Sequence, residues 1–429
     1  MARLGLVAVL RDHTFRSLRH RNYRLYFLGQ IISFTGSWMQ SAALMWLVFD
    51  QTNDPLWPPL LLVAQVGPTM LLGTWAGHLA DRRPKRSLIF ATQSAFLGTA
   101  CLLTLLVASD LTNAWLFLGV QLLNGLIQAI DLPTRLAFVP DLVPRDDLIN
   151  AVSLNSLLFN SARAIGPALS GLLFLVAALV IERGWLPGSR AVTLGAVWCF
   201  TLNALSYGAV LTALRAINIP GEPDSVRSRV NDSFWDGFRH VLQRPHLAAV
   251  LVLTGSLCVF GWPALSLFPA YTRLALNHAE KEYSVLVSTL GAGALGAALT
   301  TATFGTVGRR GFFLATGATL TAVALGLLAL APELASAAIA AACLGFGLIL
   351  FLSTGQSAMQ LAVEDNTRGR VMALWAMTLA GSAPLGHLLA GAAASVWPVR
   401  EVFAGLAIGA ALTATGVLAL AIRGWRRGT

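Results

Sequence analysis

The chain has 429 residues, of which 56% are hydrophobic and only 12% are charged. A water-soluble protein of ordinary shape cannot cover so much apolar surface, so the composition excludes that class. Apolar runs of about 20 residues recur along the whole length, and that is the length of a helix crossing a bilayer. The sequence therefore predicts an all-α membrane protein without a large soluble domain.

The net charge of +10 does not indicate a nucleic-acid partner, because the basic residues are spread over the connections between apolar runs. The four cysteines each lie in a different apolar run and lack metal-ligand spacing. Motifs of nucleotide binding and nucleophilic catalysis are also absent from the sequence. We therefore expect no metal, no cofactor and no enzyme activity.

Residues 1–22 carry arginines around a short apolar segment, Leu4 to Leu10, with no cleavage site after it. This pattern favours a cytoplasmic interfacial helix over a signal peptide.

Apolar runs separated by charged or Pro/Gly-rich breaks predict twelve membrane-spanning helices. The expected spans are 24–49, 58–80, 87–108, 114–138, 148–181, 191–214, 246–271, 284–306, 311–330, 334–361, 371–396 and 401–422. With both termini inside, only five of the 30 Lys and Arg residues lie outside, namely Arg183, Arg190, Arg273, Lys281 and Arg400. This asymmetry favours cytoplasmic termini.

The segment 216–245 interrupts the apolar pattern with prolines and charges, and 233–242 within it is predicted to form an amphipathic helix on the inner membrane surface. It separates two six-helix halves, 23–215 and 246–422, and 423–429 form a cytoplasmic tail.

An internal repeat supports this division. A shift of 223 residues places Phe15-Arg16 on Phe238-Arg239, and a shift of 220 places Gly125, Leu154, Gly166 and Gly171 on Gly345, Leu374, Gly386 and Gly391. Two parallel six-helix repeats are the architecture of major facilitator transporters.

The turn between the second and third spans strengthens this resemblance. Its residues match the major facilitator loop signature at Gly77, Leu79, Ala80, Asp81, Arg82, Lys85 and Arg86, with Pro84 where glycine is usual. Segments 15–18, 36–40, 139–144 and 368–372 resemble the bacterial branch that includes the enterobactin exporter and macrolide efflux proteins. The resemblance implies a fold of two pseudo-symmetric six-helix bundles.

The resemblance also implies a cytoplasmic gate at this turn. Asp81 would accept hydrogen bonds from the start of helix eleven and pair with Arg370 or Arg86 in one conformation. The expected gate residues are Asp81, Arg82, Lys85, Arg86, Arg368 and Arg370. The alternative is a solvated turn that only marks topology.

Helix five contains Gly166, Pro167 and Gly171 in a pattern similar to the fifth-helix motif of superfamily antiporters. We expect a bend here and close packing against the other half, although such kinks also occur as plain structural features.

Arg163 lies near the middle of helix five, where a lone charge is costly. We expect Asp131 on helix four to compensate it, with Asn155, Asn160 or a water-filled cavity as alternatives. A structural ion pair and a substrate or proton role are both open. Asp131, Arg163 and His387 are the candidates for handling protons.

Helices one, four, seven and ten would line a central cavity. Its candidate residues are Ser33, Phe34, Ser37, Trp38, Ser41, Gln65, Gln121, Asn124, Gln128, Phe260, Trp262, Ser266 and Gln356. Aromatic and hydroxyl groups together suit a bulky amphipathic solute better than a small ion, although ordinary helix packing would use the same residue types.

The sequence thus predicts a monomeric multi-pass transporter of the bacterial inner membrane, in contact with lipids. We expect it to export an amphipathic small molecule by alternating access in exchange for protons. Two alternatives remain open: a lipid or lysolipid transporter without proton coupling, and a sensor or adaptor with a transporter fold.

Overall fold

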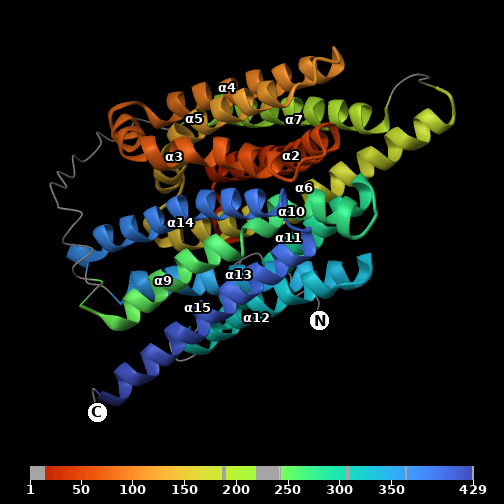
Figure 1. Ribbon diagram of the computed structural model, residues 1–429. Helices are drawn as coiled ribbons and strands as arrows, with labels where there is room; N and C mark the ends of the chain where they lie inside the picture. Colours follow the sequence, from red (N-terminus) through yellow and green to blue (C-terminus); the bar gives the residue numbers. More distant parts are fainter. Residues whose placement is uncertain are drawn as a thin grey trace, which may run out of the picture. The chain divides into compact units, whose positions relative to one another are not determined.

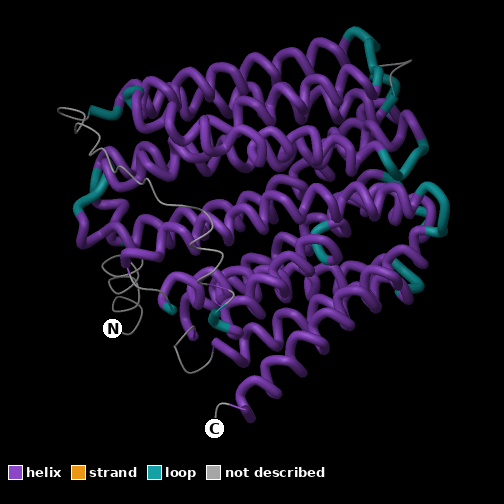
Figure 2. Tube along the Cα trace, turned by 60° about the vertical axis from the view of Figure 1, so that its left-hand side comes forward, coloured by secondary structure: helices purple, strands orange, loops and turns teal. Residues whose placement is uncertain are grey.

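The protein is all-helical in its computed structural model, which describes residues 15–185, 190–218, 241, 243–304, 310–362 and 365–427. Figure 2 shows that these residues form helices joined by short loops. The long helices are α2 (Arg21–Thr52), α3 (Trp57–Arg82), α4 (Lys85–Ala108), α5 (Ala114–Phe138), α6 (Leu148–Glu182), α7 (Ala191–Ala216), α9 (Pro245–Phe260), α11 (Glu280–Phe304), α12 (Arg310–Leu330), α13 (Leu334–Leu361), α14 (Asp365–Ala394) and α15 (Val399–Arg427) (Figure 1).

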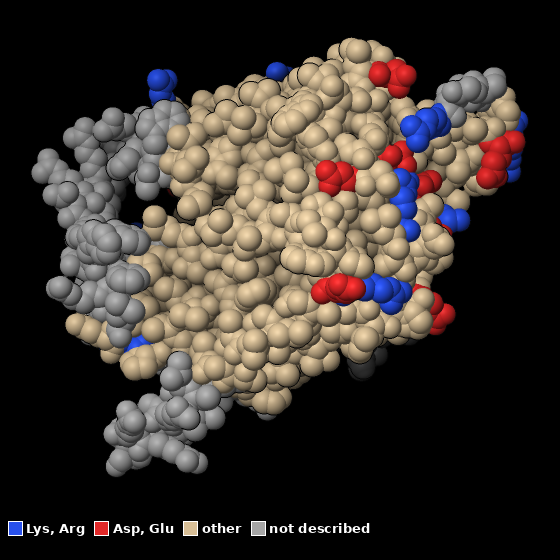
Figure 3. Space-filling model, in the orientation of Figure 1, with Lys and Arg blue, Asp and Glu red and all other residues tan. Residues whose placement is uncertain are grey.

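Each predicted span corresponds to one of these helices, with α9 forming the first part of the seventh span. Within the described residues, ten helical segments are long and apolar enough to cross a membrane, and the one from Leu247 to Ala275 runs beyond α9. Few charged side chains interrupt the face shown in Figure 3, as expected for a surface that meets lipid tails. The prediction of a twelve-helix membrane fold is confirmed. The predicted helices at 1–22 and 233–242 fall largely outside the described residues.

The seventh span is broken into three pieces. After α9 come the short helix α10 (Pro263–Ala270) and the π-helical turn η5 (Tyr271–Ala275). The break lies at Gly261 and Trp262, directly before a proline that has no backbone N–H to donate. The apolar run 246–271 predicts one continuous helix, and this prediction was wrong.

Contacts divide the chain into two compact units. Unit 1 contains Met1–Ala43 and Leu71–Arg227, and unit 2 contains Leu44–Met70 and Ser228–Thr429. The division follows the two halves of the repeat except at residues 44–70, where the end of α2 and the first half of α3 join the second unit.

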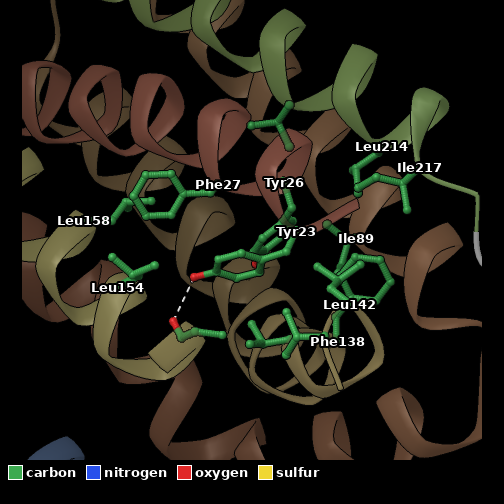
Figure 4. Close-up of a cluster of buried hydrophobic side chains, with 14 residues drawn as sticks. Tyr23, Tyr26, Phe27, Ile89, Phe138, Leu142, Leu154, Leu158, Leu214 and Ile217 are labelled. Carbon is green, nitrogen blue, oxygen red and sulfur yellow. Dashed lines mark hydrogen bonds between the residues drawn. The ribbon is translucent and has the colours of Figure 1, made fainter. Parts of the chain in front are cut away.

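Unit 1 has an apolar core at the connection between α5 and α6 (Figure 4). Tyr23, Tyr26 and Phe27 on α2 pack there against Phe138 and Leu154. The Tyr23 hydroxyl donates a 2.8 Å hydrogen bond to the Ala151 carbonyl, marked in Figure 4. The ring packing and this bond fix the start of α2 against α6.

The repeat recurs in the helix packing of each unit. A Cβ on Gly166 of α6 would lie 2.8 Å from the Thr35 carbonyl oxygen of α2, and one on Gly386 of α14 would lie 2.8 Å from the Cys258 carbonyl oxygen of α9. The glycines are related by the shift of 220 residues and the carbonyls by the shift of 223. The same close crossing is therefore built twice, and only glycine fits either position.

Candidate functional site

A buried charge pair lies between α4 and α5 in unit 1. Asp131 is fully buried, and its Oδ1 accepts hydrogen bonds from Thr92 Oγ1 at 2.7 Å and Gln93 Nε2 at 2.9 Å. Its Oδ2 lies 2.5 Å from Nε of Arg135, one helical turn further along α5. Both carboxylate oxygens are thus engaged.

Asp131 forms its ion pair with Arg135 and not with the arginine that we expected. We predicted a pair between Asp131 and Arg163, and this was wrong, because the carboxylate pairs with Arg135. The i,i+4 spacing could have revealed this pair in the sequence. The Arg135 guanidinium also lies 4.6 Å from the centroid of the Phe34 ring and donates to Gln30 Oε1 at 3.4 Å.

Arg163 is buried among aromatic rings. Its guanidinium lies 5.0 Å from the Trp38 ring centroid and 5.1 Å from that of Phe159. Stacking of this kind stabilises an arginine by cation–π attraction, more strongly away from water. Phe159 also makes edge contacts with Phe34 at 5.6 Å and with Trp38 at 5.8 Å.

These residues form one cluster, which we call the arginine–aromatic cluster: Phe34, Trp38, Arg135, Phe159 and Arg163. It joins α2, α5 and α6 within unit 1. Phe34 and Trp38 had been predicted as cavity residues, whereas Phe159 and Arg135 had not. Chemically, the cluster offers flat π surfaces for stacking and guanidinium groups for polar or anionic atoms.

Other predicted cavity residues of unit 1 instead hold helices together. Gln121 and Asn124 are buried and form a network with Thr99 of α4, through bonds of 2.9 and 2.6 Å. Ser37 lies 3.1 Å from the Tyr207 hydroxyl on α7. Ser33 is buried, while Ser41 and Gln128 are half-buried.

The predicted cavity residues of unit 2 lie in different surroundings. Phe260 borders an apolar groove of about 350 Å³ between α9, α14 and α15. Its ring packs against Gly409, where an added Cβ would lie only 2.5 Å from a ring carbon. Gln65 is half-buried, Trp262 lies at the break in the seventh span, and Gln356 is exposed. Ser266 is fully buried on α10.

His387 on α14 is buried beside the broken seventh span. Its Nδ1 lies 2.8 Å from Oγ of Ser266, which in turn lies 2.9 Å from the Pro263 carbonyl oxygen. A hydroxyl has a single proton, so donation to that carbonyl leaves Oγ to accept from a protonated Nδ1.

The predicted helix-five motif packs within its own unit. A Cβ on Gly166 would lie 2.6 Å from Trp38 Cβ and 2.8 Å from the Met39 backbone nitrogen, both on α2 of unit 1. The expected packing of this motif against the other half stays a prediction. Pro167 lies inside the continuous helix α6, and Gly171 is buried.

The predicted gate can be described only in part, because the side chains of Asp81, Arg82, Arg368 and Arg370 lie outside the described residues. Lys85 Nζ lies 2.8 Å from Asp141 Oδ2. Arg86 donates to the backbone carbonyls of Leu214 at 2.8 Å and Arg215 at 3.1 Å. A cation at the C-terminal end of α7 also complements the helix dipole.

A second charged site, not predicted from the sequence, joins the start of the chain to the α5–α6 connection. Asp147 is buried and contacts Arg16 at 2.5 Å, Arg19 at 2.8 Å and His20 at 2.6 Å. The hydrogen bond from His20, followed by the two arginines, lowers the pKa of the Asp147 carboxyl against the opposing effect of burial. We call this site the N-terminal clasp.

Comparison with known proteins agrees with this architecture. The family model described as "Transmembrane secretion effector" matches residues 12–427. The enterobactin exporter EntS of Shigella boydii is 27% identical over 413 residues, covering 94% of this chain and 92% of that one.

Two further similarities differ in extent. The staphyloferrin A transporter of Staphylococcus aureus is 30% identical over 154 residues, which span 36% of this chain and only 39% of that protein. The crystal structure of a bacterial homologue of the human lysosomal transporter Spinster aligns with a TM-score of 0.72 at 14% identity, covering 94% of this chain and 97% of that one. The chain belongs to the transmembrane secretion effector family of the major facilitator superfamily and is a multi-pass secondary transporter, not an enzyme.

Proposed function

We propose that the protein exports an amphipathic small molecule, siderophore-like or drug-like, by alternating access in exchange for protons. The observation that carries this proposal is the arginine–aromatic cluster. Charged side chains inside membrane helices are costly and usually mark a pathway or a binding site. Two guanidinium groups beside three aromatic rings match a solute that has aromatic rings and acidic or polar substituents.

The similarity to siderophore transporters supports the same choice of substrate class. The chain matches the enterobactin exporter over nearly its full length, and a shorter part matches the staphyloferrin A transporter. Siderophores combine polar oxygen ligands with a larger organic frame, and the cluster would contact both parts. We therefore use enterobactin as the first probe.

We assign the proton-handling role to His387 ahead of Asp131. Both oxygens of Asp131 are engaged by Arg135, Thr92 and Gln93, so this carboxylate serves to hold Arg135 in place. His387 has a hydroxyl partner, and an imidazole is a side chain that can accept and release a proton. Its position beside the broken seventh span would link protonation to movement of that helix.

We further propose that the protein is a monomer in the bacterial inner membrane with both termini in the cytoplasm. The distribution of Lys and Arg supports this orientation, since only five of 30 fall on the outer side.

Binding of enterobactin to the purified protein, measured by calorimetry, tests the substrate proposal. Trp38→Ala and Phe159→Ala should each weaken binding by about tenfold, because stacking of a ligand on one aromatic side chain contributes roughly 1–2 kcal/mol. Trp115→Ala, at an exposed tryptophan near the start of α5, is the control. If all three variants bind enterobactin as tightly as the wild type, the arginine–aromatic cluster is not part of the binding site.

A further inference from the structure

The end of α2 is buried on every side. Residues 44 to 49 are consecutive in this helix, and each is at most 2% exposed. A membrane helix at the surface of a bundle keeps one face toward lipid, so a segment without an exposed face must be enclosed by protein. The contacts of residues 44–70 place them in unit 2, although α2 starts in unit 1.

An ion pair holds this end of α2. Asp50 accepts a hydrogen bond from the Arg273 guanidinium, which comes from the π-helical turn η5. The same guanidinium lies 5.0 Å from the centroid of the Trp46 ring and 5.5 Å from that of Phe49. One side chain from the second half of the repeat therefore contacts three successive positions on one face of α2.

An aromatic stack extends the contact to α11. Trp46 and Tyr283 are both fully buried, and their rings are stacked with centroids 5.4 Å apart. The Trp46 Nε1 and Tyr283 Oη atoms are buried without a hydrogen-bond partner among the described residues. Unsatisfied buried donors cost free energy, and both would regain water if the helices separated. This cost opposes the favourable stacking of the two rings.

The backbone around Arg273 departs from a regular α-helix. η5 ends at Ala275, and Asn277, two residues later, has a φ of 62°. The amide of His278 donates back to the Thr272 carbonyl at 2.9 Å. Asparagine tolerates this left-handed conformation better than most residues. Single π-helical turns often occur at functional positions, where they shift a side chain relative to a regular helix.

We propose that Asp50, Arg273, Trp46 and Tyr283 form a latch that closes the transport path at the C-terminal end of α2 and opens in each cycle. The latch joins a helix of the first repeat to two elements of the second. It rests on the proposed alternating-access function, because only a cycling transporter needs a closure that opens. It also lies at the end of α2 remote from the Tyr23 core and the N-terminal clasp.

Hydrogen–deuterium exchange of the full-length protein in detergent tests the latch without any substrate. Asp50→Asn and Arg273→Gln should each accelerate amide exchange in residues 44–52 and 271–283 by roughly tenfold, the range expected when one coupling contact is lost. Exchange in the Tyr23 core should stay unchanged. Arg273→Lys should recover only part of the protection, since a lysine keeps the charge but cannot stack as a planar group.

Lys281→Gln is the matched control, because the exposed Lys281 side chain forms only a 3.6 Å pair with its neighbour Glu282 at the start of α11. It should leave exchange in both segments unchanged. Unchanged exchange in the Asp50 and Arg273 variants would overturn the latch. A uniform rise across all helices would overturn it too, because the pair would then support overall stability. Failure to transport enterobactin would count against the proposed function alone.

Discussion

Replacing either member of the Asp131–Arg135 pair should destabilise the protein far more than replacing both. Asp131→Asn leaves the Arg135 guanidinium without its counter-charge, and the Arg135 side chain is only 13% exposed. Arg135→Gln leaves a fully buried carboxylate, although Thr92 and Gln93 still donate to it. Removing one partner of a buried pair costs about 3–5 kcal/mol, whereas removing both is often close to neutral.

The double-mutant cycle gives the expected magnitude directly. If each single change costs about 3 kcal/mol and the double change about 1–2 kcal/mol, the coupling free energy is about 4–5 kcal/mol. The assay is thermal or denaturant unfolding of the detergent-solubilised protein, followed by circular dichroism for the wild type, both single variants and the double variant. Additive losses would show that the two side chains do not stabilise one another and would refute the pairing.

Two further predictions concern packing and pH. Gly166→Val should destabilise the protein by about 1–3 kcal/mol or prevent folding, because its side chain would overlap α2. Gly98→Val, at a helical glycine where an added Cβ would meet no atom of another helix within 4 Å, should have little effect on unfolding in the same assay. Asp147→Asn should lower the melting temperature at neutral pH, since the lowered pKa of Asp147 stabilises the folded state while the carboxyl is ionised. A melting series against pH should show this difference persisting above about pH 5 and shrinking below about pH 4, as the wild-type carboxyl takes up its proton. A gap that stays the same at acid pH would contradict the role given to the N-terminal clasp.

The sequence predicted the helices and the repeat well, because both depend on patterns that are local or periodic. Bilayer thickness sets the span length, and a duplicated fold repeats its glycine crossings, so Gly166 and Gly386 could be matched before any coordinates. The break at Gly261 was missed, because the run from 246 to 271 is apolar throughout and hydropathy does not distinguish a broken helix from a continuous one.

Side-chain partners were harder to predict, because they depend on which helix faces meet. Arg163 was recognised as needing compensation, but its aromatic neighbours Trp38 and Phe159 came from two helices whose relative rotation the sequence does not give. Arg135 was overlooked since it stood near the expected end of its span. Asp50 and Arg273 lie 223 residues apart in the sequence, and only the fold brings them together.

Substrate export driven by proton exchange should be measurable as transport by proteoliposomes. The vesicles contain the purified protein and a pH-sensitive dye, and enterobactin flux is followed under an imposed pH gradient in the wild type and in His387→Gln. We expect enterobactin to move in one direction while protons move in the other. This flux should stop when the pH gradient is collapsed, and it should be strongly reduced in His387→Gln. Enterobactin flux that continues unchanged after the gradient is collapsed would contradict proton coupling and favour an uncoupled or lipid transporter. Absence of flux for any siderophore, drug or lysolipid would favour a sensor or adaptor.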